Sequence, residues 1–245
     1  LVAYENKENS EALKYFKSSK FLINQHDPFL KKYIYSLVLE GKVQHATNEI
    51  KQNLKKNNSN FFDAYLMLAL DSMMKKKYKK SKDYLQKSYE FIGDDKISLI
   101  IVETLKQYLY VFRENKFLNK KKRFGNFTAI NEVFQKCYLN DKNTENYFNV
   151  LINNDEDRNY SRYIFFYTNY LIENNRYDEA KKLTKNLNYI NSSLLVSQTK
   201  YWIENQKIKE FKKIFSCKNS NDIVSELFFL IANLYSSQDD YESSN

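Results

Sequence analysis

The residues that could do chemistry are few and lie far apart. The chain has two histidines, His26 and His45, and both stand near predicted helix ends with no partner at the spacing of a metal site. We expect them to lie on helix surfaces rather than to act as a general base or a metal ligand. The two cysteines, Cys137 and Cys217, form no CxxC pair, and we predict that each is an ordinary half-buried helix residue.

The other common motifs of catalysis are also missing from the sequence. The three glycines are isolated, so no glycine-rich loop is available to hold a phosphate. Acidic clusters at 94–95, 155–157 and 239–240 fall at predicted turns or helix starts, where a carboxylate caps free N–H groups. The sequence therefore predicts a protein that is not an enzyme and that carries no metal and no cofactor.

Composition predicts the elements that position any binding residues. Three glycines and one proline in 245 residues are far below the usual shares of about 7% and 5%. A chain with so few turn residues is mostly helices joined by short polar turns. Hydrophobic residues make up 42% of the chain, including 21 tyrosines and 18 phenylalanines, which is ample for a core. We therefore predict an all-α fold.

The charge and the first residues of the chain give expectations about its surface and its cellular location. The net charge is +9, but the lysines are spread over polar helix faces, which indicates a solvated basic surface. No stretch of about 18 uncharged apolar residues exists, so no segment is predicted to span a membrane. The chain begins at Leu1 without a leader pattern, so we expect any targeting segment to have been removed or to lie outside it. The composition is typical of a bacterial protein. Both an exported or envelope-associated location and a cytoplasmic location are compatible with the sequence.

A helical hairpin can be read directly from residues 162–187. Apolar residues from Ile164 to Leu171 follow helical spacing, and Asn174 and Asn175 then interrupt the pattern. A second helix opens at Tyr177. Its small residue, Ala180, lets two antiparallel helices approach to about 8–10 Å.

The same pattern recurs along the chain at intervals close to about 34 residues. Small residues stand at the predicted crossing in most copies, namely Ala12, Ala46, Ser81 and Ala180. The copy at 195–215 has Phe211 at this position, and a further copy is predicted to turn at 239–241. We expect Phe211 to splay its hairpin or to shift its register.

This pattern resembles that of tetratricopeptide-repeat proteins, at Ala12–Phe16, Tyr65–Ala69, Tyr177–Ala180 and their equivalents. The resemblance covers most of the chain and implies a right-handed α-solenoid of stacked antiparallel helix hairpins, forming a single domain over 1–245. Regular repeats are expected at about 1–92 and 160–245, with truncated repeats at both ends, as in a fragment of a longer array.

The middle of the chain, about 93–159, carries longer and irregular hairpins. We predict helices over 97–115, around 129–137 and over 144–153, with a basic turn at 120–125. The alternative is two short arrays that meet at a linker near 116–126.

The resemblance also implies a binding surface, because the first helix of each hairpin lines the concave groove in this family. It gives the following tentative binding residues: Lys31, Tyr35, Leu66, Leu70, Met73, Arg162, Phe165, Asn169, Lys200, Phe229 and Asn233. Asn169 and Asn233 share a repeat position, where an amide could pair with a peptide backbone. The set lacks the Lys/Asn clamp with which family members hold a C-terminal carboxylate.

The sequence thus predicts a scaffold that binds a protein or peptide partner. The less favoured alternative is a basic module for nucleic acid or another anionic polymer, using the lysines of 75–82 and the run 120–123. The oligomeric state is not predicted.

Overall fold

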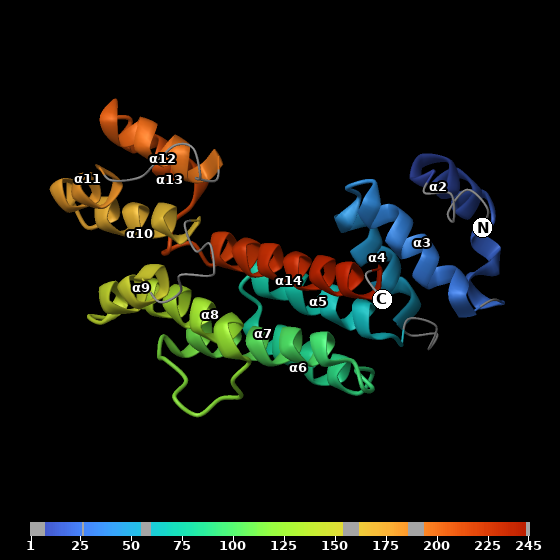
Figure 1. Ribbon diagram of the computed structural model, residues 1–245. Coiled ribbons are helices and arrows are strands. Elements are labelled where there is room, and N and C mark those ends of the chain that lie inside the picture. The colour runs from blue at the N-terminus through green and yellow to red at the C-terminus, as the bar shows by residue number, and fades with distance from the viewer. Residues whose placement is uncertain (1–7, 26, 55–59, 154–161, 186–193, 244–245) are drawn as a thin grey trace. The chain divides into compact units, whose positions relative to one another are not determined.

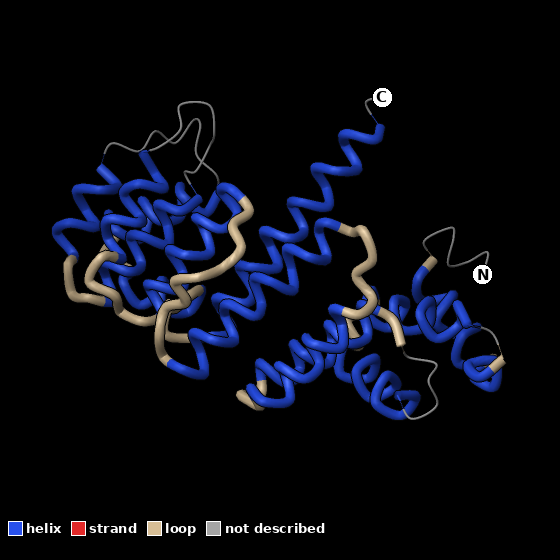
Figure 2. The backbone as a smooth tube through the Cα atoms, turned by 90° about the horizontal axis from the view of Figure 1, so that it is seen from below, coloured by secondary structure: helices blue, strands red, loops and turns tan. Residues whose placement is uncertain are grey.

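Helices make up every regular element that the structure describes. The computed structural model describes residues 8–25, 27–54, 60–153, 162–185 and 194–243. Within these residues it contains thirteen α-helices, one 3-10 helix and no strand (Figures 1 and 2). This confirms the all-α prediction.

The chain divides into two compact units, 1–102 and 103–245, and the division falls inside helix α7 (Lys96–Glu114). It does not fall at the linker near 116–126 that the alternative prediction named. A single solenoid over the whole chain stays a prediction.

The first unit consists of a short N-terminal pair of helices and two hairpins. Its elements are α2 (Asn9–Ser18), η1 (Lys20–Asn24), α3 (Asp27–Leu39), α4 (Val43–Asn53), α5 (Phe62–Met74), α6 (Tyr78–Tyr89) and the start of α7. Apolar residues at helical spacing, such as Leu30, Ile34 and Leu37, are fully buried in its core.

The second unit continues from α7 with three hairpins and a long last helix. Its elements are α8 (Gly125–Tyr138), α9 (Thr144–Asn153), α10 (Arg162–Glu173), α11 (Tyr177–Lys185), α12 (Leu194–Glu204), α13 (Ile208–Ile214) and α14 (Ser220–Ser243). The three helices predicted for the middle of the chain are confirmed in α7, α8 and α9. The turn predicted at 239–241 is wrong, because α14 runs through it. The segment contains no glycine or proline, and two aspartates alone do not end a helix.

One turn geometry joins the two helices of all five hairpins. In each turn a single residue has a positive φ: Gly41 (70°), Lys76 (56°), Asn140 (50°), Asn175 (61°) and Gln206 (53°). In each, the next N–H donates back to the carbonyl five residues earlier, as from Lys42 to Leu37 at 2.8 Å and from Arg176 to Leu171 at 2.8 Å. This is the Schellman pattern, which satisfies the last carbonyls of the first helix.

The small residues predicted at the helix crossings are buried. Ala46, Ser81 and Ala180 are 0% exposed, and each stands five residues after the positive-φ residue of its turn. The Ser81 hydroxyl donates to the Ala69 carbonyl at 2.8 Å, so this buried polar group is satisfied. Phe211, which replaces the small residue in the last hairpin, is also fully buried.

The two cysteines are joined in a disulfide, so the prediction that they are ordinary helix residues is wrong. Cys137 lies on α8, Cys217 lies in the turn before α14, and their Cα atoms are 5.6 Å apart. Both are buried. The bond closes a loop over 80 positions, and sequence spacing alone does not reveal such a pairing.

Several sequence predictions lie outside the described residues. They concern His26, the truncated repeat at the start of the chain over residues 1–7 and the acidic triplet at 155–157.

Candidate functional site

The predicted binding residues of the first unit lie on α3 and α5. Tyr35 donates its hydroxyl to Asp63 Oδ2 at 2.6 Å, and Lys31 Nζ lies 3.5 Å from the same oxygen. Leu66 and Leu70 are half-buried on α5. Met73 is 2% exposed, so the expectation that it faces a groove is wrong. Asp63, which sequence reasoning missed, links the two helices at this surface.

Two predicted residues of the second unit are buried, and their expected exposure is wrong. Phe165 and Asn169 are both 0% exposed. Phe165 stacks on Phe211 with ring centroids 5.8 Å apart, and Asn169 Nδ2 donates to the carbonyls of Phe211 (3.3 Å) and Phe215 (2.9 Å). Helix α13 therefore covers the face of α10 that the repeat pattern left open.

The remaining predicted residues of this unit do not form one surface. Lys200 on α12 is half-buried, and Asn233 on α14 is exposed. Arg162 and Phe229 are brought together: the Arg162 guanidinium carbon lies 3.8 Å from the centroid of the Phe229 ring. Arg162 also makes a two-bond pair with Glu226, at 3.1 Å from Nε and 2.7 Å from Nη2.

Glu226 is the most buried carboxylate at this place, at 5% exposed. Burial raises its pKa, and the hydrogen bonds and charge of Arg162 oppose that rise. A pocket of about 320 Å³ lies beside the pair, lined by α10, α12, the end of α13 and α14. Because Arg162 already satisfies the carboxylate, the pair is accounted for as a structural link between α10 and α14.

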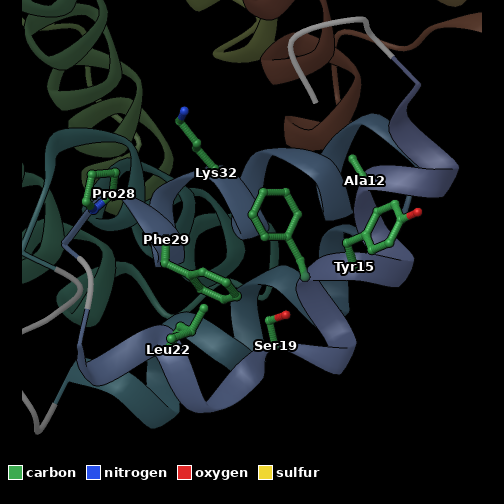
Figure 3. Close-up of a pocket in the computed structure, with 8 residues that line it drawn as sticks. Ala12, Tyr15, Ser19, Leu22, Pro28, Phe29 and Lys32 are labelled. Carbon is green, nitrogen blue, oxygen red and sulfur yellow. The ribbon is translucent and has the colours of Figure 1, made fainter. Parts of the chain in front are cut away.

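A second pocket, in the first unit, was not predicted. It has a volume of about 230 Å³ and is lined by Ala12, Tyr15, Phe16, Ser19, Leu22, Pro28, Phe29 and Lys32. Figure 3 shows the side chains of Leu22 and Phe29 lying together while Lys32 extends away from them. We call this pocket, between α2, η1 and α3, the α2–α3 groove. Its lining is almost entirely apolar.

The groove follows from the spacing of small and aromatic residues on α2. Ala12 and Ser19 are two turns apart on one helix face, with Tyr15 and Phe16 between them, so two short side chains leave a hollow flanked by rings. The Tyr15 side chain is 58% exposed although it is aromatic. A small–aromatic–aromatic–small pattern on one face is the signal that sequence reasoning could have used.

The groove and the predicted residues of α3 are neighbours on the helix surface. On α3, Pro28, Lys32, Tyr35 and Leu39 follow one another three or four residues apart along one stripe, and Lys31 lies one turn before Tyr35. Leu39 is 61% exposed. A partner bound in the groove would therefore lie next to the Lys31–Tyr35–Asp63 cluster on the surface of α3.

Two acidic side chains of the first unit, Asp71 and Glu49, are held in pairs with cations. Asp71 on α5 accepts a hydrogen bond from Lys51 on α4 at 2.8 Å and pairs with Lys75. Burial alone would raise the pKa of Asp71, but the hydrogen bonds and charges of the two lysines outweigh it and lower the pKa. His45 lies on α4 at the surface, as expected, with Nε2 3.1 Å from Glu49.

Over the described residues, no cluster of three or more His, Cys, Asp or Glu is arranged to hold a metal ion. In the same part of the chain, every helix is too short or too polar to cross a lipid bilayer. No protein-family model, no curated protein and no solved structure matches the chain. Its class is thus stated from the fold alone, as an all-helical protein built of hairpins.

Proposed function

We propose that this protein is a non-enzymatic interaction scaffold that binds a peptide or a segment of a protein partner. The α2–α3 groove is the single observation that carries the proposal, because an apolar surface lined by three aromatic rings is left open to solvent. We also propose that the hairpins stack as a tetratricopeptide-like solenoid, a class in which partner binding is the usual role of the surface.

The groove sets the size of the segment that it accepts. Ala12 and Ser19 mark its length along α2, and seven residues of helix span about 10 Å. Two anchors at i and i+3 or i+4 of a short amphipathic helix lie about 4.5–6 Å apart along its axis and so fit within that length. Aromatic anchors suit the rings of Phe16 and Phe29, which themselves meet edge to face at 5.2 Å.

The surroundings of the groove favour acidic residues next to these anchors. Lys14 and Lys17 are exposed on α2, and Lys32 lines the groove. Glu11 is the nearest exposed acid on that helix and is already in contact with the Tyr15 hydroxyl at 3.3 Å. The partner segment is therefore apolar on one side and acidic on the other.

A peptide selection tests the proposal. Random peptides displayed on phage are selected on the intact chain, and the affinity of an enriched peptide is measured by fluorescence polarisation. We expect apolar or aromatic anchors three or four residues apart beside Asp or Glu. Ser19→Trp, which fills the groove, and Tyr15→Ala, which removes one wall, are each expected to weaken binding about tenfold or more.

Ser18→Trp is the matched control. Ser18 neighbours Ser19 but is exposed and does not line the groove. It is expected to leave the affinity within about twofold. Peptides that bind the Ser19→Trp and Ser18→Trp variants equally well would show that the groove is not the binding site.

A further inference from the structure

The loop between α7 and α8 is the most basic segment of the second unit. Four of its cations, Lys116, Lys120, Lys122 and Arg123, are exposed over residues 115–124. The loop itself contains no acidic residue. Within the second unit, positive charge is therefore concentrated at this loop. We call residues 115–124 the basic loop.

The fifth cation of the loop points inward and anchors it. The Lys121 side chain is 2% exposed, and its Nζ lies 3.0 Å from Glu132 Oε1 on α8 and 3.7 Å from the centroid of the Phe117 ring. Lys136 Nζ lies 4.4 Å from the same centroid. Burial lowers the pKa of Lys121, and the Glu132 carboxylate opposes this shift. Burying an ammonium group is costly, and the Glu132 carboxylate compensates that cost. Lys121 therefore ties the loop to α8 instead of facing solvent.

Two further hydrogen bonds hold the backbone of the loop. Gln107 Nε2 on α7 donates to the Lys122 carbonyl at 3.4 Å, and the Phe124 N–H donates to Thr128 Oγ1 at 2.7 Å. Arg123 Nη2 lies 3.5 Å from Glu132 Oε1 while its side chain is 75% exposed. The exposed cations are thus presented from a backbone that is tied to both flanking helices.

The lack of exposed apolar side chains around the basic loop restricts the class of partner that it can bind. From residue 113 to 126, all of which the structure describes, no large apolar or aromatic side chain is exposed. A protein partner is bound mainly through buried aromatic and apolar anchors, a membrane surface is commonly entered by such side chains, and single-stranded nucleic acid is held by base stacking. Phosphates along a duplex need only fixed cations.

We infer that the basic loop binds the phosphate backbone of double-stranded nucleic acid, without reading its sequence. This surface is separate from the α2–α3 groove and does not depend on the function proposed for it. Each phosphate neutralised by a cation contributes about −0.9 to the slope of log K against log salt. Four contacts predict that raising the salt from about 50 to about 200 mM weakens binding about 150-fold.

The experiment measures the anisotropy of a labelled 20-base-pair DNA duplex of random sequence with the intact chain at these two salt concentrations. The triple variant Lys120→Gln/Lys122→Gln/Arg123→Gln is expected to weaken binding at least tenfold at the lower salt. Its salt dependence is expected to fall to about threefold, as for one remaining contact.

The matched control removes the same charge elsewhere. Lys181, Lys182 and Lys185 are exposed on α11, and replacing all three by Gln is expected to change the affinity by less than about threefold. Equal losses in the two triple variants would overturn the inference, because net charge would then explain the binding. So would the absence of duplex binding at the lower salt, or binding to vesicles of anionic lipid without binding to the duplex.

The anchor is tested separately. The double variant Lys121→Met/Glu132→Gln removes the buried pair but keeps all four exposed cations. It is expected to weaken duplex binding about three- to tenfold, with the fluorescence of the single tryptophan showing that the second unit is folded. Full affinity in a folded double variant would overturn the role of Lys121 as an anchor.

Discussion

Breaking the Cys137–Cys217 bond is expected to destabilise the second unit strongly. The two residues are 80 positions apart. In the chain-entropy model, the entropy that a cross-link over that distance removes from the unfolded chain corresponds to about 4.5 kcal/mol of stability at 25 °C. A domain of this size has a total stability of about 5–15 kcal/mol. Reduction therefore removes a large share of what keeps this unit folded.

The single tryptophan makes the effect measurable in one unit. Trp202 lies on α12, and its ring meets that of Phe211 at 5.2 Å, so its fluorescence reports on the second unit alone. With a urea dependence of about 2 kcal/mol per molar, the reduced protein is expected to unfold at a midpoint about 2 M lower. The double variant Cys137→Ala/Cys217→Ala should match the reduced protein, and a reductant should not change it further.

A separate measurement shows that the Cys137–Cys217 disulfide has been reduced. Thiol titration under denaturing conditions counts two free thiols in the reduced chain, since the sequence contains only these two cysteines. If both thiols are free and the tryptophan midpoint moves by less than about 0.5 M, the loop-closure reasoning is refuted for this protein.

Three other perturbations test the remaining structural arguments. Asn169→Ala should lower the free energy of unfolding by about 1–2 kcal/mol because the buried Phe215 carbonyl loses its side-chain donor and the Phe211 carbonyl keeps only its backbone bond, whereas the exposed Asn233→Ala should change it by under about 0.5 kcal/mol. Urea titrations followed by tryptophan fluorescence compare them, and equal effects would contradict this role of the amide. The pKa of Asp71 is lowered below the ordinary 3.8, so its stabilisation is present above that pH and is lost as the pH falls through the lowered value. The stability gap between wild type and Asp71→Asn should therefore close on acidification below about pH 4, and a constant gap in urea titrations across this range would argue against the effect. At the turns, Gly41→Ala should cost about 1 kcal/mol although nothing lies within 4 Å of the added methyl, and Lys76→Gly should cost less or stabilise, as measured by urea titration with circular dichroism.

The helices could be predicted because their apolar residues repeat at helical spacing. The segment predicted over 97–115 is α7 at Lys96–Glu114, and the one predicted over 144–153 is α9. The hairpin crossings could also be predicted, since only a short side chain fits where two helices approach closely, and Ala46 and Ala180 are both fully buried.

The turn residues show where such prediction ends. Gly41 and Asn175 are residues that tolerate a positive φ, and the sequence marks them as turns. Lys76 and Gln206 take the same conformation without that preference, because the hydrogen bonds from the turn back to the preceding helix fix it. The disulfide and the α2–α3 groove were missed because both depend on which elements meet in space.

Phe165 and Asn169 were predicted to be exposed but are buried, and one side chain explains both. At the crossing where three other hairpins carry alanine or serine, Phe211 reaches across to stack on Phe165, and α13 comes to lie against α10. The Phe211 carbonyl accepts the capping N–H of Phe215 at 3.2 Å, and Asn169 on α10 donates both to it and to the Phe215 carbonyl. A repeat position that could offer its amide to a bound peptide is used here to end a neighbouring helix. The departure from the repeat pattern that the sequence revealed at Phe211 is therefore also the reason that the groove predicted for this unit is filled by the protein itself.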